Sequence, residues 1–109
     1  MQTLTHCELD DGQLGDDTGR ADHVAEVLKA LAHPIRLRIV AVLCRGDENV
    51  SSLARRLACK QAIISQQLRI LRMRDLVQAT RDQGYAYYAL KEMRLTDLVH
   101  CVEGCSVPR

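Results

Sequence analysis

Apolar positions recur with the spacing of amphipathic helices from residue 22 onward. The first stripe keeps i, i+3, i+4, i+7 spacing, which predicts one apolar helix face: Val24, Val27, Leu28 and Leu31. Pro34 cannot continue that helix, and its fixed φ suits the first position of the next one. A second helix is therefore predicted over 34–44, with Ile35, Ile39, Val42 and Leu43 facing inward.

Two further helices are predicted close together. Ser51 and Ser52 are good N-caps for a short helix in 52–59 (SLARRLAC). A second helix follows over about 61–74, and its inward positions are Ile64, Leu68 and Leu71. A connection of about three residues between two such helices is typical of a helix-turn-helix.

The last third of the chain changes from strands back to helix. The runs VQATR and YAYYAL are rich in β-forming residues, and Asp82-Gln83-Gly84 between them predicts a hairpin turn. A final helix is expected over about 91–103, with a stripe of Leu95, Leu98, Val99 and Val102. The element order predicts a mainly α (α+β) fold, a winged helix-turn-helix with additional N- and C-terminal dimerisation helices.

Charge divides the chain into an arm and a domain. The 109 residues have a formal net charge of only +1. Residues 1–20 hold five acidic side chains against Arg20 and little periodicity, so we expect a mobile acidic arm there and one domain over 21–109. Within 55–81, seven Lys and Arg side chains stand against Asp75 alone. Such a cationic band suits a polyanionic partner.

Composition excludes several other classes of protein. No apolar run approaches the ~20 residues of a membrane span, and the N-terminus lacks the apolar stretch of a signal peptide, so we expect no membrane partner. Five cysteines without an export signal favour the reducing cytoplasm over a disulfide framework. The absence of Trp and Phe argues against a stacking platform for single-stranded nucleic acid.

The predicted helix after the turn carries side chains suited to double-stranded DNA. Amide and hydroxyl groups can read base edges in the major groove, while Arg and Lys contact phosphates. The candidate DNA-binding residues are Lys60, Gln61, Ser65, Gln66, Arg69 and Arg72, with Arg81 and Gln83 near the hairpin tip. The alternative for these residues is an ordinary solvated polar surface. The order of elements favours DNA.

Four segments resemble one family of bacterial repressors. They are LKALAHPIRLRIVAVL (28–43), SSLARRL (51–57), IISQQLRILRMRDLV (63–77) and YAYYAL (85–90). Together they make residues 22–103 similar to the metal- and metalloid-responsive ArsR/SmtB repressors. The resemblance implies a homodimer formed by the first and last helices, which leaves operator DNA when an inducer binds. It implies no enzymatic activity and no small-molecule substrate. The family often has Gly where Asp75 stands and His where Gln67 stands.

Two cysteines on the last predicted helix are the candidate effector ligands. By the resemblance, an early zinc-ligand pair of the family falls on Glu92 and Arg94, and arginine cannot bind a metal. Cys101 and Cys105 lie four residues apart at one edge of the apolar stripe, about 5–6 Å between Cβ atoms. That spacing suits two thiolates sharing a soft ion such as arsenite, Cd, Pb or Zn. Cys7 in the arm is the candidate third ligand.

The cysteine thiols also fit roles other than binding an ion. Both residues of the pair could simply fill the edge of an interface. The main alternative is a redox or persulfide switch that uses Cys44, Cys101 and Cys105. A thiol enzyme needs a pocket, a base near its nucleophile and an orienting group. It is disfavoured, because a chain of 109 residues that binds DNA and dimerises has little left to form them. A module that binds protein through the same helices and hairpin is a further alternative.

Overall fold

A computed structural model describes residues 13–104 of the chain. The elements, in order, are η1 (Leu14–Asp16), α2 (Thr18–Leu31), α3 (Pro34–Leu43), β1 (Glu48–Asn49), α4 (Val50–Leu57), α5 (Gln61–Met73), β2 (Val77–Asp82), β3 (Tyr85–Leu90) and α6 (Leu95–Glu103). The predicted order of helix, helix, helix-turn-helix, hairpin and helix is confirmed, and strand β1 is an addition.

The N-terminal helix starts earlier than the sequence pattern indicated. We placed the boundary between arm and domain at residue 21, but α2 begins at Thr18. Asp17 is the N-cap, and its carboxylate accepts a hydrogen bond of 2.9 Å from the backbone N–H of Arg20. Leu14–Asp16 form a short 3-10 helix before it. The rest of the predicted arm, including Cys7, lies outside the described residues, so its mobility stays a prediction.

The break between α2 and α3 depends on His33 and Pro34. His33 is the N-cap of α3, and its Nδ1 accepts a hydrogen bond of 3.2 Å from the backbone N–H of Ile35. Pro34 occupies the first turn of α3, where its missing N–H costs nothing. A structural role for His33 at this helix boundary is therefore supported by its contacts.

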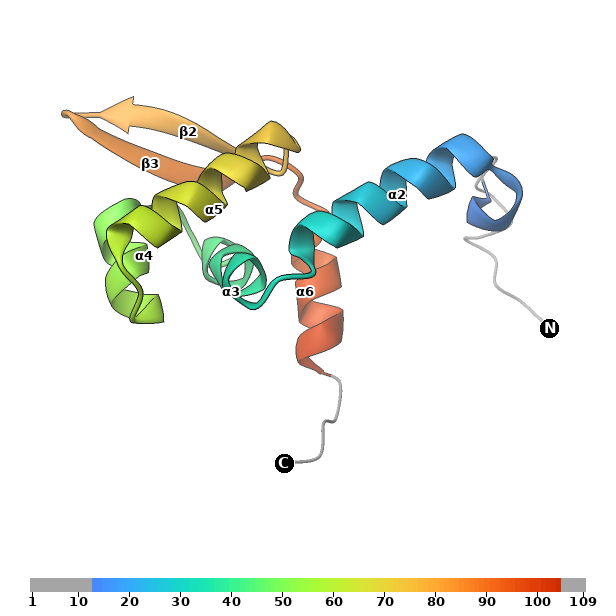
Figure 1. Cartoon of the computed structure of the whole chain (residues 1–109), viewed down its shortest axis with the longest axis horizontal. Coiled ribbons are helices and arrows are strands. Elements are labelled where there is room, and N and C mark those ends of the chain that lie inside the picture. The colour runs from blue at the N-terminus through green and yellow to red at the C-terminus, as the bar shows by residue number, and fades with distance from the viewer. Residues whose placement is uncertain (1–12, 105–109) are drawn as a thin grey trace.

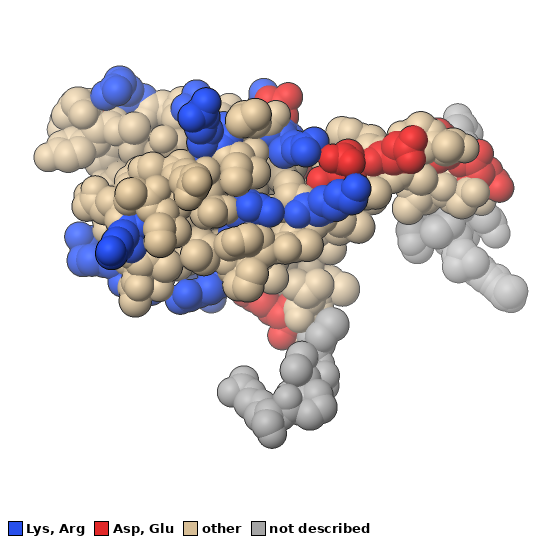
Figure 2. Space-filling view, in the orientation of Figure 1, with Lys and Arg blue, Asp and Glu red and all other residues tan. Residues whose placement is uncertain are grey.

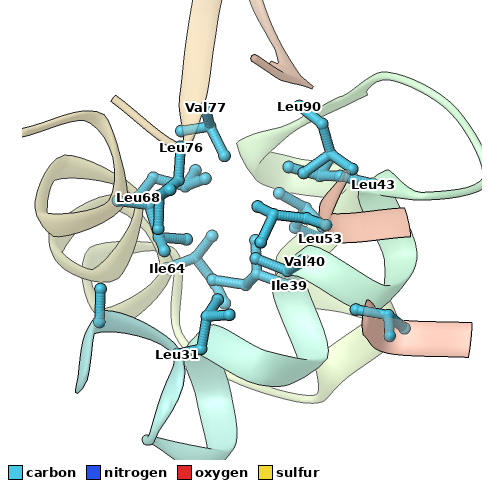
Figure 3. Packing of buried hydrophobic residues seen from close by; sticks show 14 of the residues in the cluster. Leu31, Ile39, Val40, Leu43, Leu53, Ile64, Leu68, Leu76, Val77 and Leu90 are labelled. Carbon is cyan, nitrogen blue, oxygen red and sulfur yellow. The ribbon is translucent and has the colours of Figure 1, made fainter. Parts of the chain in front are cut away.

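One apolar core joins α3, α4, α5, the hairpin and α6 (Figure 3). Ile39, Leu53, Ile64 and Leu68 have no exposed surface. The three inward positions expected on α5, Ile64, Leu68 and Leu71, are all buried. Truncating a leucine at such a site leaves a cavity and costs about 2–5 kcal/mol. The helix that carries the candidate DNA-reading residues is thus held by its inner face.

The first helix of the helix-turn-helix is capped differently from the prediction. We expected Ser51 or Ser52 as the N-cap, but α4 begins at Val50 and Asn49 is the cap. The side chain of Asn49 accepts a hydrogen bond of 2.8 Å from the backbone N–H of Ser52. The sequence pattern misses this because Asn49 also pairs with Tyr87 as part of strand β1, a contact distant in sequence.

The three strands form an antiparallel sheet in the order β1-β3-β2. Strands β2 and β3 make the predicted hairpin, with Arg81 opposite Ala86 and Asp82 opposite Tyr85. Gln83 and Gly84 both have positive φ, 52° and 84°, which a tight two-residue hairpin turn requires. The turn therefore lies where the Asp82-Gln83-Gly84 signal placed it.

The last helix is shorter than predicted and its apolar stripe is only partly exposed. Helix α6 begins at Leu95 rather than near residue 91. The first and last helices were expected to form a dimer, but Leu31 and Leu95 of their apolar stripes are buried within one chain, 5% and 3% exposed. Leu28 and Val102 are exposed, and Leu98 is half-buried. The apolar surface left for a partner is therefore smaller than the stripes suggested.

Helix α2 extends away from the rest of the molecule (Figure 1). Its C-terminal end meets α3 and α6, while its N-terminal half and η1 project outward. All side chains from Leu14 to Arg20 are exposed. Within residues 13–104, no helix is long and apolar enough to cross a membrane.

Candidate nucleic-acid interface

Helix α5 divides into a buried face and an exposed polar face. The residues predicted to meet DNA on or beside α5 are all exposed: Lys60, Gln61, Ser65, Gln66, Arg69 and Arg72. Lys60 occupies the N-cap position of α5, so the positive end of the helix dipole and this side chain lie together. The arrangement offers amide and hydroxyl groups for base edges between cationic groups for phosphates.

The turn before α5 sets the direction in which the helix leaves α4. Ala58 has a left-handed backbone conformation with φ 56°, and this ends α4. The Arg38 guanidinium of α3 donates a hydrogen bond of 3.4 Å to the carbonyl of Leu57. Gln61, the first residue of α5, donates from its side-chain amide to the hydroxyl of Ser51 at 3.2 Å. The first contact joins α3 to the end of α4, and the second joins the start of α5 to α4.

The hairpin turn and the N-terminal end of α5 lie toward the same side of the molecule, at the left in Figure 1. Arg81 and Gln83, the two residues predicted to contact DNA from the hairpin, are exposed. An arginine on a hairpin beside a major-groove helix can contact the DNA backbone or the minor groove, where the negative potential favours Arg.

Charge is unevenly distributed over the surface. In Figure 2, Asp and Glu side chains gather over α2 and η1, while Lys and Arg spread over the part that holds α4, α5 and the hairpin. A duplex carries one negative charge per about 1.7 Å of its axis. The surface over α4, α5 and the hairpin therefore attracts it, and the acidic surface over α2 and η1 repels it.

Two residues beside the predicted set were missed by the sequence pattern. Ile63 is 38% exposed although it neighbours the fully buried Ile64, so an apolar group lies on the outer side of α5. An apolar side chain there can contact a thymine methyl group. Ser51 holds the side chain of Gln61. The helical period alone would have predicted that Ile63 faces outward. The contact of Ser51 with Gln61 joins two elements, so no local pattern in the sequence indicates it.

The candidate effector ligands are only partly covered by the described residues. Cys101 is exposed on α6. Cys7 and Cys105 lie outside the described residues. Among residues 13–104, no three His, Cys, Asp or Glu side chains form a group that could hold a metal ion. A shared site would therefore need at least one of the two thiols beyond this range.

Cys44 lies on the opposite side of α6 from Cys101. It lines a cavity of about 190 Å³ between α3 and α6, together with Thr96, Val99, His100 and Glu103. At 100° per residue, Cys101 lies about 150° around the helix from the centre of that face. Burial raises the pKa of the Cys44 thiol, and the Glu103 charge adds to this, while Thr96 and Arg45 oppose it. Cys44 thus has the features of a protonated, half-buried thiol.

Cys59, in the turn before α5, is also half-buried. Its thiol donates a hydrogen bond of 3.5 Å to the carbonyl of Leu57.

A groove of about 440 Å³ runs between α2 and the start of α6. Val24, Val27 and Leu28 line it from α2, and Leu95 and Leu98 line it from α6. At its rim, Arg94 donates to the carboxylate of Glu92, with 2.9 Å between Nε and Oε2. This contact lowers the pKa of Glu92 to about 2. The groove is apolar at its base and charged at its edge.

Comparisons with known proteins agree with this architecture. The model of the family described as "Bacterial regulatory protein, arsR family" matches residues 33–79. A biofilm growth-associated repressor of Xylella fastidiosa is 36% identical over 83 residues, which cover 76% of this chain and 73% of that protein. The homodimeric winged helix-turn-helix domain of Mb0332 from Mycobacterium bovis aligns with a TM-score of 0.71 at 30% identity, over 86% and 87% of the two chains. Reduced HlyU from Vibrio cholerae aligns with a TM-score of 0.75 at 26% identity, over 81% and 95%.

Proposed function

The chain belongs to the ArsR family of bacterial regulatory proteins, and from this we propose that it is a homodimeric repressor that binds operator DNA and releases it when an inducer binds. Its relatives are DNA-binding transcriptional regulators rather than enzymes. The observation that carries the proposal is the exposed polar face of α5 beside a hairpin that exposes Arg81, with the buried face of α5 in the core.

In this proposal the two parts of the interface have different tasks. Gln61, Ser65 and Gln66 lie in the first two turns of α5, where a recognition helix contacts base edges. Lys60, Arg69 and Arg72 neutralise phosphates on either side, and Arg81 and Gln83 approach the flanking groove. The phosphate contacts supply affinity for any duplex, and the amide and hydroxyl groups supply the preference for one sequence.

The homodimer is proposed to form through α2 and α6. The groove lined by Val24, Leu28 and Leu98 exposes apolar surface that a second copy would cover. The Mycobacterium bovis domain, which is homodimeric, has the same fold. In such a dimer, two α5 helices about 34 Å apart would meet successive major grooves on one side of the duplex.

The salt dependence of DNA binding tests this interface. Binding to a duplex selected in vitro should weaken steeply with salt, with a log–log slope of about −0.9 per phosphate contact. Arg72→Ala or Arg81→Ala should weaken binding to all duplexes and reduce the slope by about 1. Gln61→Ala or Gln66→Ala should instead relax the base preference.

A matched control removes an equal charge elsewhere. Arg45 is exposed just after the end of α3 and lines the cavity between α3 and α6. Arg45→Ala should leave the salt slope unchanged, and fluorescence anisotropy titrations at several salt concentrations would measure all five variants. A wild-type protein whose affinity for duplex DNA is independent of salt would contradict the proposal.

For the inducer we propose a soft metal or metalloid ion, such as arsenite, Cd, Pb or Zn, held by thiolates. Cys101 is exposed on α6 beside the half-buried Leu98 edge, and Cys105 follows four residues later. Cys7 from the arm is the candidate third ligand. An ion closed between these thiols would act next to the proposed dimer interface, so it could shift the spacing of the two α5 helices. The proposal requires the reducing cytoplasm, where thiols persist.

Replacing single thiols tests the effector site. Cys101→Ser and Cys105→Ser should each bind the selected duplex as tightly as wild type but no longer release it on adding Cd or arsenite. Cys44→Ser and Cys59→Ser are the controls and should stay inducible. Ultraviolet absorption should show a sulfur-to-metal charge-transfer band in the wild type, and a band that survives in the Cys101/Cys105 double variant would refute the site.

The redox alternative makes a different prediction. If persulfide or peroxide alone releases the DNA, and Cys44→Ser abolishes this, the inducer is an oxidant or sulfur donor and not an ion. The positions of Cys44 and Cys101 on different sides of α6 disfavour a bond between them without movement of that helix.

A further inference from the structure

We propose that four side chains brace the DNA-reading helix α5 against α2 and act as positioning residues for DNA recognition. They are Glu26 and Arg36 together with Gln67 and Arg74, and we call them the α2–α5 brace. The proposal rests on the proposed function, since it matters only if α2 forms part of the dimer. None of the four is among the residues proposed to touch DNA.

The centre of the brace is the guanidinium of Arg36 on α3. Its Nε donates to the carbonyl of Ala30 in the last turn of α2. Its Nη1 donates to Oε1 of Gln67 on α5 at 2.8 Å. One planar, rigid group therefore joins three helices, and a flexible ammonium would not hold the same two directions.

The break in the chain at Pro34 creates the need for this donor. In a continuous helix, the carbonyl of Ala30 would accept from the backbone N–H of residue 34. Pro34 has no N–H, so that carbonyl lacks its helical donor, and Arg36 supplies one from two residues further along. Ala30 itself is only 5% exposed, where an unsatisfied carbonyl would be costly.

The second contact of the brace is an ion pair one turn earlier on α2. The Glu26 carboxylate lies 3.0 Å from Nη1 of Arg74, which is the C-cap of α5. Glu26 and Ala30 are four residues apart and share one face of α2, while Gln67 and Arg74 are seven apart and share one face of α5. Two points on each helix are thus joined, which restricts both the distance and the angle between them.

Such a brace would fix the direction of α5 relative to the dimer interface. In the proposed dimer, α2 lies at the interface and α5 enters the major groove. An effector that moves α2 at the interface would then move α5 together with α2 as one rigid unit. Without the brace, each α5 would still bind its half-site. The dimer would, however, discriminate less between duplexes whose two half-sites are spaced differently.

The test uses neutral or acidic residues of the brace, so that no phosphate contact is lost. Gln67→Met removes the acceptor at similar volume, and Gln67→Glu keeps an acceptor for Arg36. The probes are a two-half-site duplex selected in vitro with wild-type protein, the same duplex with one base pair inserted in its spacer, and a single half-site. Gln67→Met should lose about tenfold in affinity for the selected duplex, equivalent to about 1.4 kcal/mol. It should also lose most of the wild-type penalty for the inserted base pair, and Gln67→Glu should restore both.

Glu26→Gln tests the second contact and has a matched control. Glu26 also lies 3.5 Å from Lys29 on the same helix, so Lys29→Gln removes that pair but leaves Arg74 in place. Glu26→Gln should reduce the spacing penalty, and Lys29→Gln should not. Affinity for the single half-site and the salt slope should equal the wild-type values in every variant, which separates positioning from loss of folding or of phosphate contacts.

Two results overturn different claims. If the wild-type protein shows no preference for two half-sites over one, the proposed dimeric repressor fails. If the wild type shows that preference and a spacing penalty, and Gln67→Met and Glu26→Gln keep both unchanged, the brace is refuted while the proposed function stands.

Discussion

At the scale of single residues, identical side chains acquire different chemistry from their surroundings. Cys44 is half-buried between α3 and α6, where desolvation raises the pKa of its thiol. Cys101 lies on the outer side of α6 and is exposed. Because the thiolate is the reactive form, burial protects Cys44 in two ways, by limiting access and by holding its proton.

Alkylation should therefore distinguish the two thiols. At neutral pH, iodoacetamide should modify Cys101 faster than Cys44 by at least about tenfold, as measured by mass spectrometry of the digested protein. In guanidinium chloride the difference should vanish, because both thiols are then solvated.

The raised pKa of Cys44 also makes the stability of the fold depend on pH. The folded state holds the Cys44 proton more tightly than the unfolded state, so the free energy of unfolding falls as pH rises above the ordinary thiol pKa of 9.0. Cys44→Ala should reduce that alkaline loss.

At the scale of elements, helix ends are set by individual capping residues. Asn49 caps α4 although two serines follow it, because β1 holds its backbone in the extended conformation that a cap needs. Ser51 and Ser52 are instead inside the first turn, where they contact Gln61 and Glu48. Asp75 adopts φ 60° after α5, a left-handed backbone conformation that favours glycine.

Removing the cap should destabilise the protein at α4. Asn49→Ala should lower the free energy of unfolding by about 1 kcal/mol, because a backbone N–H of the first turn loses its acceptor. Asn49→Asp should retain most of the stability, since a carboxylate accepts the same bond. Ser51→Ala should change stability little. Urea denaturation of the three variants gives the comparison, and a larger loss for Ser51→Ala than for Asn49→Ala would show that the cap is misassigned.

At the scale of the whole molecule, the groove between α2 and α6 is an apolar surface that the described residues of a single chain leave partly uncovered. Leu28 is 48% exposed in it, and Val102 further along α6 is 42% exposed. Most of the described elements lie away from the projecting N-terminal half of α2 (Figure 1). A second copy placed there would cover both helices.

A charge placed in this groove should separate the proposed dimer. Leu28→Asp or Leu98→Asp should sediment as a monomer at micromolar concentration, because a carboxylate buried without a partner opposes association. Met73→Asp is the control: Met73 is more exposed, at 74%, but lies at the end of α5 outside the groove. It should stay a dimer. A wild-type protein that sediments as a monomer would contradict the interface.

Local signals predicted the five α-helices and the hairpin of residues 13–104 in the observed order, whereas η1 and strand β1 were missed. The periods of Val24 to Leu31 and of Ile64 to Leu71 follow from neighbours three and four residues apart, and Pro34 and Gly84 act through their own backbone. All eight candidate DNA-binding residues are exposed, as the helix period and the hairpin turn predicted, and their contact with DNA stays a prediction.

Contacts between distant segments determine which apolar positions are covered and which polar side chains are paired. Leu28 and Leu31 belong to one stripe, yet the fold buries Leu31 and leaves Leu28 exposed. The pairing of Glu48 with Tyr88 and the bond from Arg36 to Gln67 join residues far apart in the chain. Burial and such contacts depend on which distant segment arrives at a site, and a pattern of near neighbours carries no information about that.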